Sequence, residues 1–455
     1  MPQPKANPIC TIRSVLTFPA ASRKPSGMQR TLIALVAGLL LTNNTFAAKS
    51  PNIVLIISDD QAWTDYSFMG HEAIETPNID RLAKQSRLFK RGYVPSSLCC
   101  PSLASIVTGL YPHQTKITGN EPPIPPDGKR SAEYQRRVQE CVSFIDTVPT
   151  LPRLLAKRGY VSHQSGKWWQ GHYSRGGFTH GMTHGDPKRG GRHGDAGLKI
   201  GREGMDEIFD FIEEAGDKPF FVWYAPFLPH TPHNPPKRLL EKYAKKTESK
   251  FIARYWAMCE WFDETCGQLL DHLDEKKLAD NTIVLYVTDN GWIQRADNGR
   301  YAPRSKRSQY DGGLRTPIMV RWPGKVKPED RPELANSIDL APTILKACGL
   351  APTEAMQGID LLDDTALAKR KSTYGAVYLH NAVDIHKPSA NLTYRWLING
   401  NWKLILPHKP NTNPDAESEL YNLAKDPHEH QNLAKTKPTQ TKRLARQLNK
   451  LLPES

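Results

Sequence analysis

Residues 52–60 read Asn-Ile-Val-Leu-Ile-Ile-Ser-Asp-Asp, an apolar and largely β-branched run that ends in two carboxylates. A run without alternation is typical of a strand that is buried on both faces of a parallel sheet. In open α/β sheets, ligands bind at the carboxyl ends of such strands. We therefore expect a central strand of an α/β domain, with Asp59 and Asp60 at its functional edge.

Two later runs have the same character. Residues 220–225 lead into Pro229-His-Thr-Pro232, and residues 282–288 end in Asp289 and Asn290. Because parallel strands end at one edge of a sheet, Asp289 and Asn290 are expected beside the aspartates that follow the first strand.

Three carboxylates and one amide oxygen would then lie together. Adjacent carboxylates repel one another, so a cation is implied, and the oxygen ligands favour Ca²⁺ over the smaller and more regular Mg²⁺. For Asp59 and Asp60 taken alone, a capped turn is the alternative.

The stretch 97–109 contains two adjacent cysteines before a predicted helix. It reads Ser-Leu-Cys-Cys-Pro-Ser-Leu-Ala-Ser-Ile-Val-Thr-Gly, and Pro101 is a suitable first helical residue. Cys99 is thus expected just before a helix N-terminus, where the helix dipole favours an anion and would activate a nucleophile. The alternative is a buried helix whose cysteines only pack.

Composition limits the class of protein. A chain of 455 residues is too long for one small core, and its formal net charge of +14 suits an anionic substrate or polymer. The sequence has no arginine-rich helix, zinc-finger spacing or interleaved aromatic and basic residues, so we expect no nucleic-acid partner. The cysteines of the mature chain have no regular spacing that specifies disulfides, and Cys259 and Cys266 are expected to face the core.

The N-terminal segment has the pattern of a secretory signal peptide. Arg30 precedes the apolar run 32–41, and Phe46-Ala-Ala48 provides small residues for cleavage. We expect a periplasmic or secreted protein with no membrane span after processing, because the apolar run is too short for one. Met28 is an alternative start; a long leader is the other interpretation.

The pattern of expected strands and helices divides the rest of the chain into two parts. Strand and helix patterns alternate over residues 49–371, whereas residues 372–455 contain short β segments, a hairpin signal at Asn399-Gly400 and a final helix. We predict a leader over 1–48, a catalytic domain over 49–371 and a C-terminal α+β subdomain. Residues 317–322 are interpreted as an edge strand because of Pro317.

The stretch around Cys99 resembles the signature of the formylglycine-dependent (type I) sulfatases of the alkaline phosphatase superfamily. Their pattern is Cys, any residue, Pro, Ser, Arg and then Thr-Gly. With Pro101 aligned, Cys99 takes the place of the cysteine that is oxidised, and Leu103 stands where the family has arginine.

Three more segments are similar to sulfatase motifs. Lys167 lies in a Gly-Lys-Trp segment whose next residue, histidine in the family, is Trp169 here; His172 is the nearest histidine in sequence, with His180 and His184 behind it. His230 matches the histidine of a Pro-His-x-Pro motif, and Lys306 precedes an acidic-Gly-Gly triplet as the family's lysine does.

The resemblance implies a fold and a chemistry. The fold is α/β, an alkaline-phosphatase-like α/β/α sandwich with a smaller C-terminal antiparallel β subdomain. A formylglycine-generating maturation enzyme would convert Cys99 into 3-oxoalanine (formylglycine). Lys167, His230 and Lys306 would bind and turn over a sulfated small molecule or glycan beside a Ca²⁺ ion held by five residues: Asp59, Asp60, Cys99, Asp289 and Asn290.

Two other functions remain open. The same site could hydrolyse a phosphodiester or phosphonate ester. Leu103, Trp169 and the basic surface suggest instead a non-catalytic binder of sulfated glycans.

Overall fold

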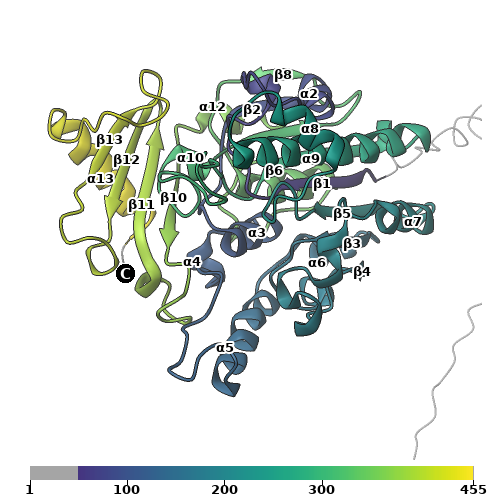
Figure 1. The fold of residues 1–455 in the computed structure, drawn as a ribbon, viewed down its shortest axis with the longest axis horizontal. Helices are drawn as coiled ribbons and strands as arrows, with labels where there is room; N and C mark the ends of the chain where they lie inside the picture. Colours follow the sequence, from purple (N-terminus) through teal and green to yellow (C-terminus); the bar gives the residue numbers. More distant parts are fainter. Residues whose placement is uncertain (1–49, 454–455) are drawn as a thin grey trace, which may run out of the picture. The chain divides into compact units, whose positions relative to one another are not determined.

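The computed structural model describes residues 50–453, so the predicted leader lies outside the described residues. Its main sheet has nine strands in the order β4-β3-β5-β1-β6-β7-β2-β8, with β9 paired to β2 (Figure 1). The strands are β1 (Asn52–Ser58), β2 (Arg87–Tyr93), β3 (Val161–Gly166), β4 (His180–Gly181), β5 (Phe220–Ala225), β6 (Thr282–Thr288), β7 (Arg315–Arg321), β8 (Glu329–Arg331) and β9 (Ala335–Asn336).

The stretch that opens the domain is the central strand. Every residue of β1 is buried, and β1 pairs in parallel with β5 on one side and β6 on the other. Side chains of a strand alternate between faces, so Ile53, Leu55 and Ile57 enter one core and Val54 and Ile56 the other. The predicted α/β fold class is confirmed.

Helices cover both faces of the sheet (Figure 1). One core contains side chains of α3 (Cys99–Thr108), α6 (Leu151–Ala156) and α11 (Leu340–Ala347). The other contains α2 (Pro77–Lys84), α7 (Asp206–Ala215) and α9 (Lys250–Glu275), and α8 (Lys237–Ala244) packs on α9. Cys259 and Cys266 are buried free thiols on α9, as expected.

Strand β7 differs from the expectation. It lies between β6 and β2, pairing with both in antiparallel fashion, and is therefore interior. Pro317 is tolerated because the ladder to β6 begins only at Met319, and pairing with β2 is irregular between Phe89 and Gly92. The missing N–H thus falls where no ladder hydrogen bond is lost.

A second sheet forms the C-terminal part. Its four antiparallel strands are β10 (Ser372–Tyr378), β11 (Leu392–Asn399), β12 (Trp402–Pro407) and β13 (Glu419–Asn422), and α13 (Pro438–Leu451) packs on it through Leu444 and Leu448. The predicted hairpin at Asn399-Gly400 joins β11 to β12, with Gly400 at a φ of 59°. The domain boundary between residues 371 and 372 stays a prediction.

None of the helices within residues 50–453 has the length and apolar character needed to cross a bilayer.

A buried ion cluster joins the two sheets. Lys403 of β12 places its Nζ 2.8 Å from Asp311 Oδ1 and 2.8 Å from Glu429 Oε1, and the Asp311 N–H donates to Glu429 Oε2 at 2.7 Å. All three side chains are at most 1% exposed. Asp311 opens α10 (Asp311–Leu314), the short helix that leads into β7, so this cluster couples the C-terminal sheet to the main sheet.

We expect this cluster to make stability depend on pH. Burial, opposed by Lys403, raises the pKa of Glu429 to about 7. The folded state then binds this proton more tightly than the unfolded chain, so Glu429 stabilises the fold most below its ordinary pKa and the contribution is lost as pH rises to about 7. The stability advantage of wild type over Glu429→Gln should fall by about 3 kcal/mol across that window in urea unfolding.

The matched control for this titration is Glu417→Gln, which changes a glutamate whose side chain is 60% exposed in the same part of the chain. It should leave the pH dependence as in wild type. A Glu429→Gln curve parallel to the wild-type curve would contradict the expected titration.

Candidate active site at the carboxyl edge of the main sheet

Two strand ends meet at the carboxyl edge of the sheet. Ser58 of β1 pairs with Thr288 of β6, so the residues that follow them leave the sheet side by side. The Asp60 N–H donates to Asp289 Oδ1 at 3.0 Å, and Asn290 Nδ2 donates to Asp60 Oδ1 at 2.7 Å. The register of the parallel strands thus brings together the four oxygen-bearing side chains that the sequence placed at strand ends.

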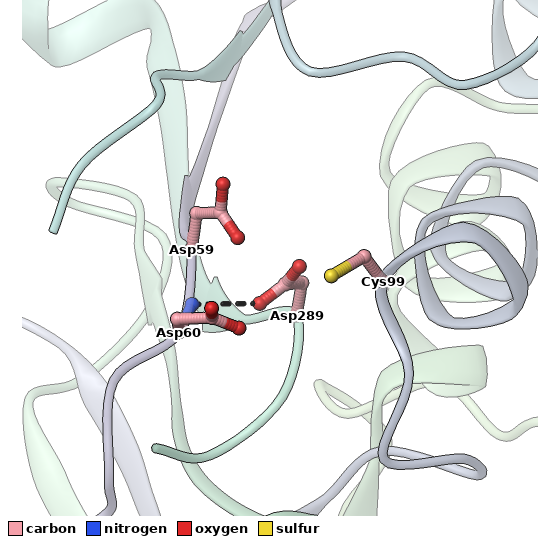
Figure 2. A group of neighbouring side chains, drawn as sticks. All are labelled: Asp59, Asp60, Cys99 and Asp289. Carbon is pink, nitrogen blue, oxygen red and sulfur yellow. Dashed lines mark hydrogen bonds between the residues drawn. The ribbon is translucent and has the colours of Figure 1, made fainter. Parts of the chain in front are cut away.

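The arrangement fits a hard cation. One ligand atom each from Asp59, Asp60, Asp289 and Cys99 lies within 4.8 Å of all the others, and Figure 2 shows these side chains converging. Asp289 Oδ2 and Asn290 Oδ1 are buried and accept no hydrogen bond from the described residues. Burial raises the pKa of Asp59 and of Asp289. A bound Ca²⁺ would satisfy these oxygens and favour their ionised forms.

Cys99 is the first residue of α3, so the helix begins two residues earlier than Pro101 predicted. Its Sγ lies 3.6 Å from Lys167 Nζ. Burial raises the pKa of the Cys99 thiol well above its ordinary value, although the nearby ammonium of Lys167 opposes the shift. The unmodified residue is therefore a neutral thiol. Leu103, at the arginine position of the signature, is buried in the core.

Two lysines contact the acidic cluster. Lys167 Nζ lies 2.9 Å from Asp59 Oδ2, and Lys306 Nζ lies 2.6 Å from Asp60 Oδ1. Burial alone would lower the pKa of each ammonium, but the paired aspartate raises it. Burial likewise opposes ionisation of Asp60, yet the neighbouring ammonium of Lys306 holds its pKa at about 2. Both lysines are thus fixed cations beside Cys99.

His230 completes the set of predicted residues. It follows β5 on the Pro229–Pro232 loop, and its Nε2 lies 3.3 Å from Asp60 Oδ2. Burial, reinforced by Lys167, lowers the pKa of His230 well below its ordinary value. The imidazole is therefore neutral in this arrangement. All eight residues singled out in the sequence lie around one point.

The candidates for the missing motif histidine are placed differently from the prediction. His172 bonds to Ser174 on a separate loop, and neither it nor His180 nor His184 lines the cavity that contains Cys99. His193 does line it, with its ring 4.0 Å from that of Trp169. Sequence spacing could not find this residue, because the chain turns back through a long loop before His193 reaches the cavity.

The cavity has a volume of about 350 Å³ and a largely aromatic wall. Loops supply most of this wall, including residues that no sequence pattern marked: Asn120, Leu198, Phe227, Trp292, Tyr301, Arg307 and His380. The glycine- and histidine-rich segment 171–204 contributes His193 and Leu198 to this wall.

The fold and this site define a hydrolase of the alkaline-phosphatase-like α/β class. The sequence matches the Sulfatase family model over residues 51–350, and a second model, "N-sulphoglucosamine sulphohydrolase, C-terminal", over residues 299–455. The chain belongs to the sulfatase family, whose members are sulfuric ester hydrolases.

Similar proteins agree with this assignment. The human N-acetylgalactosamine-6-sulfatase is 30% identical over 363 residues, covering 70% of this chain and 66% of the relative. An N-acetylgalactosamine-6-O-sulfatase of Bacteroides thetaiotaomicron is 25% identical, covering 92% and 96%. The structure of BT4656 in complex with its substrate D-glucosamine-2-N,6-O-disulfate shares the fold, with a TM-score of 0.69, 20% identity, and coverage of 90% and 100%.

Proposed function

We propose that the protein hydrolyses sulfate esters of carbohydrates, with Cys99 in its 3-oxoalanine form and a Ca²⁺ ion held by the surrounding aspartates. The buried cluster of Asp59, Asp60 and Asp289 around Cys99 is the observation that carries this proposal. Relatives named for sulfated N-acetylgalactosamine support the carbohydrate substrate. The predicted signal peptide supports action in the periplasm or outside the cell, after conversion of Cys99 by a maturation enzyme.

Two groups that the chain would acquire, 3-oxoalanine at position 99 and a bound Ca²⁺ ion, would each contribute to the reaction. The aldehyde of 3-oxoalanine at position 99, once hydrated, would provide a hydroxyl nucleophile, and Ca²⁺, held by Asp59, Asp60, Asp289 and Asn290, would offset negative charge on the sulfate. The neutral buried thiol of the unmodified residue would be a poor nucleophile, which supports the need for conversion.

The chain's own residues would do the remaining work. Lys167 and Lys306 are already oriented on either side of the aspartates, so they can stabilise charge that spreads over the sulfate oxygens without reorganising. We assign the proton of the leaving-group oxygen to His230, which is neutral here and must first take up a proton; its contact with Asp60 favours that protonated form against the burial that disfavours it. Such proton transfer contributes about 10²–10⁴ in rate.

The test combines an assay with mass spectrometry. Protein purified from its native host should release sulfate from an aryl sulfate, and its Cys99 peptide should have the lower mass of 3-oxoalanine. Faster cleavage of an aryl phosphodiester would instead identify a phosphodiesterase on the same site. An unmodified Cys99 in protein that binds sulfated glycans without turnover would identify a binding protein.

Removal of the metal should abolish activity. Asp289 Oδ2 and Asn290 Oδ1 accept no hydrogen bond from residues 50–453 and would lose the proposed Ca²⁺ on chelation, so sulfate release should fall at least about 10²-fold and return with added Ca²⁺. Ca²⁺ at 100 times its Kd should raise the unfolding free energy by about 2.7 kcal/mol. Thermal unfolding with and without the ion measures this, and equal curves would contradict the proposed site.

The matched variant for the metal is Asp289→Asn, which keeps the shape of the side chain but removes its charge. It should reduce the stabilisation by Ca²⁺ without lowering stability in chelator. Mg²⁺ should restore less activity than Ca²⁺, because the larger ion suits irregular oxygen sites.

A further inference from the structure

The wall of the cavity around Cys99 includes a third cation that is not paired with an aspartate. Lys167 and Lys306 are paired with Asp59 and Asp60. Arg307, the next residue along the chain, also lines the cavity, and none of the residues that line it is acidic. Within the described residues, no carboxylate forms an ion pair with Arg307. Its exposed guanidinium is therefore available to a ligand.

The backbone holds Arg307 in an unusual conformation. Its φ is +66°, in the left-handed region that non-glycine residues rarely adopt. The Arg307 N–H donates to Ser97 O at 2.9 Å, which ties this residue to the loop that leads into Cys99. Residues held in this region cost about 1–3 kcal/mol and cluster at ligand-binding sites. The fold thus holds the backbone from which this guanidinium extends along the cavity wall.

Neighbouring side chains suit a sugar. His380, in the loop after β10, lines the same wall, and its Nδ1 lies 2.6 Å from Asn381 Oδ1. Because that oxygen only accepts, Nδ1 carries the proton and Nε2 is left to accept a hydrogen bond from a hydroxyl. Trp292 and Tyr301 add apolar surface. The mouth of the cavity therefore combines a cation, an acceptor and aromatic surface.

We propose that the substrate carries a second anionic group besides the sulfate ester that is cleaved, and that Arg307 binds this group. The inference rests on the proposed function of the site. A planar guanidinium binds either a carboxylate or a sulfate through paired hydrogen bonds, so a uronate or a second sulfate on the sugar would satisfy it. A neutral sugar would leave the guanidinium without a partner.

The test compares three sulfated sugars. The first has one sulfate and no other charged group, and is called the neutral sugar below; the second is its disulfated counterpart, and the third is a monosulfated disaccharide with a uronate. Arg307→Asn removes the charge but tolerates the left-handed backbone, and Arg307→Lys retains a charge. Arg300→Ala is the matched control, an exposed arginine of the same loop that does not line the cavity.

Wild type should prefer one of the two dianionic substrates, and that preference identifies the second group as carboxylate or sulfate. Arg307→Asn should lower kcat/KM for that substrate by about 10–100-fold, mainly through KM, while changing the neutral sugar less than about twofold. Arg307→Lys should recover part of the loss, and Arg300→Ala should behave as wild type.

The same comparison should hold for binding without turnover. Calorimetry on Cys99→Ala protein should show weaker binding of the preferred substrate when Arg307→Asn is added. Equal effects on neutral and dianionic sugars, or none on either, would overturn the role of Arg307. If protein with converted Cys99 releases sulfate from none of the sugars, the proposed function is wrong. The binding result would still decide whether Arg307 binds a second anion.

Discussion

Replacing Cys99 by alanine abolishes sulfate release, and we expect kcat to fall roughly 10⁴-fold or more. The proposed nucleophile derives from this side chain, and no other thiol or hydroxyl in the described cluster occupies its place beside Lys167 and the aspartates. The fold should survive, because a small neutral side chain is exchanged for a smaller one. Sulfate release and thermal unfolding, measured on the same preparation, separate the two effects.

The neighbouring cysteine provides the control. Cys100 is equally buried, but its Sγ accepts a hydrogen bond from Gln170 and does not contact the acidic cluster. Cys100→Ala should therefore keep activity within a few-fold of wild type. Comparable losses in the two variants would show that the stretch acts only through packing.

Replacing Lys403 by methionine should destabilise the protein by about 3–5 kcal/mol. Lys403 is fully buried between Asp311 and Glu429, so its removal leaves two carboxylates without their main counter-charge. Activity should fall as well, because Asp311 begins the turn that supports a strand end of the site. This turn contacts the chain that follows Asp289 and Asn290 closely. The Gly291 N–H donates to Gly313 O at 2.9 Å, and the backbone approach is so close that a Cβ on Gly291 would lie 2.1 Å from Gly312 O.

Urea unfolding measures the loss of stability, and two further variants test its cause. Lys403→Met combined with Glu429→Gln removes one charge of each sign and should recover part of the stability. Lys435→Met removes a lysine whose side chain is 80% exposed and that pairs with Glu417, and should cost less than about 1 kcal/mol. A cost that small for Lys403→Met would show that the cluster does not stabilise the junction.

The sequence predicts the central architecture because that part depends on local patterns. The unbroken apolar runs of β1, β5 and β6 identify buried parallel strands, and the parallel register then brings Asp59 and Asp289 together. The resemblance to sulfatase motifs adds Cys99, Lys167, His230 and Lys306, which lie at the same edge.

The remainder depends on contacts that local patterns do not encode. His193 and Arg307 lie on loops and line the same cavity, although their spacing in the sequence gives no sign of this. The interior position of β7 depends on two features of its ladders: the pairing with β2 is irregular opposite Pro317, and the pairing with β6 begins only at Met319. The raised pKa of the Cys99 thiol results mainly from burial, which depends on the packing around α3 and not on the local sequence.

The ion cluster of Lys403, Asp311 and Glu429 also limits how this enzyme can be shortened or recombined. A truncated protein that ends before Ser372 would lose the lysine and the glutamate together and keep Asp311 in the interior without its main positive partner. Grafting the small sheet of another protein onto residues 50–371 would require a lysine at the position that Lys403 occupies. The C-terminal sheet is therefore an integral part of the catalytic unit, not an exchangeable module.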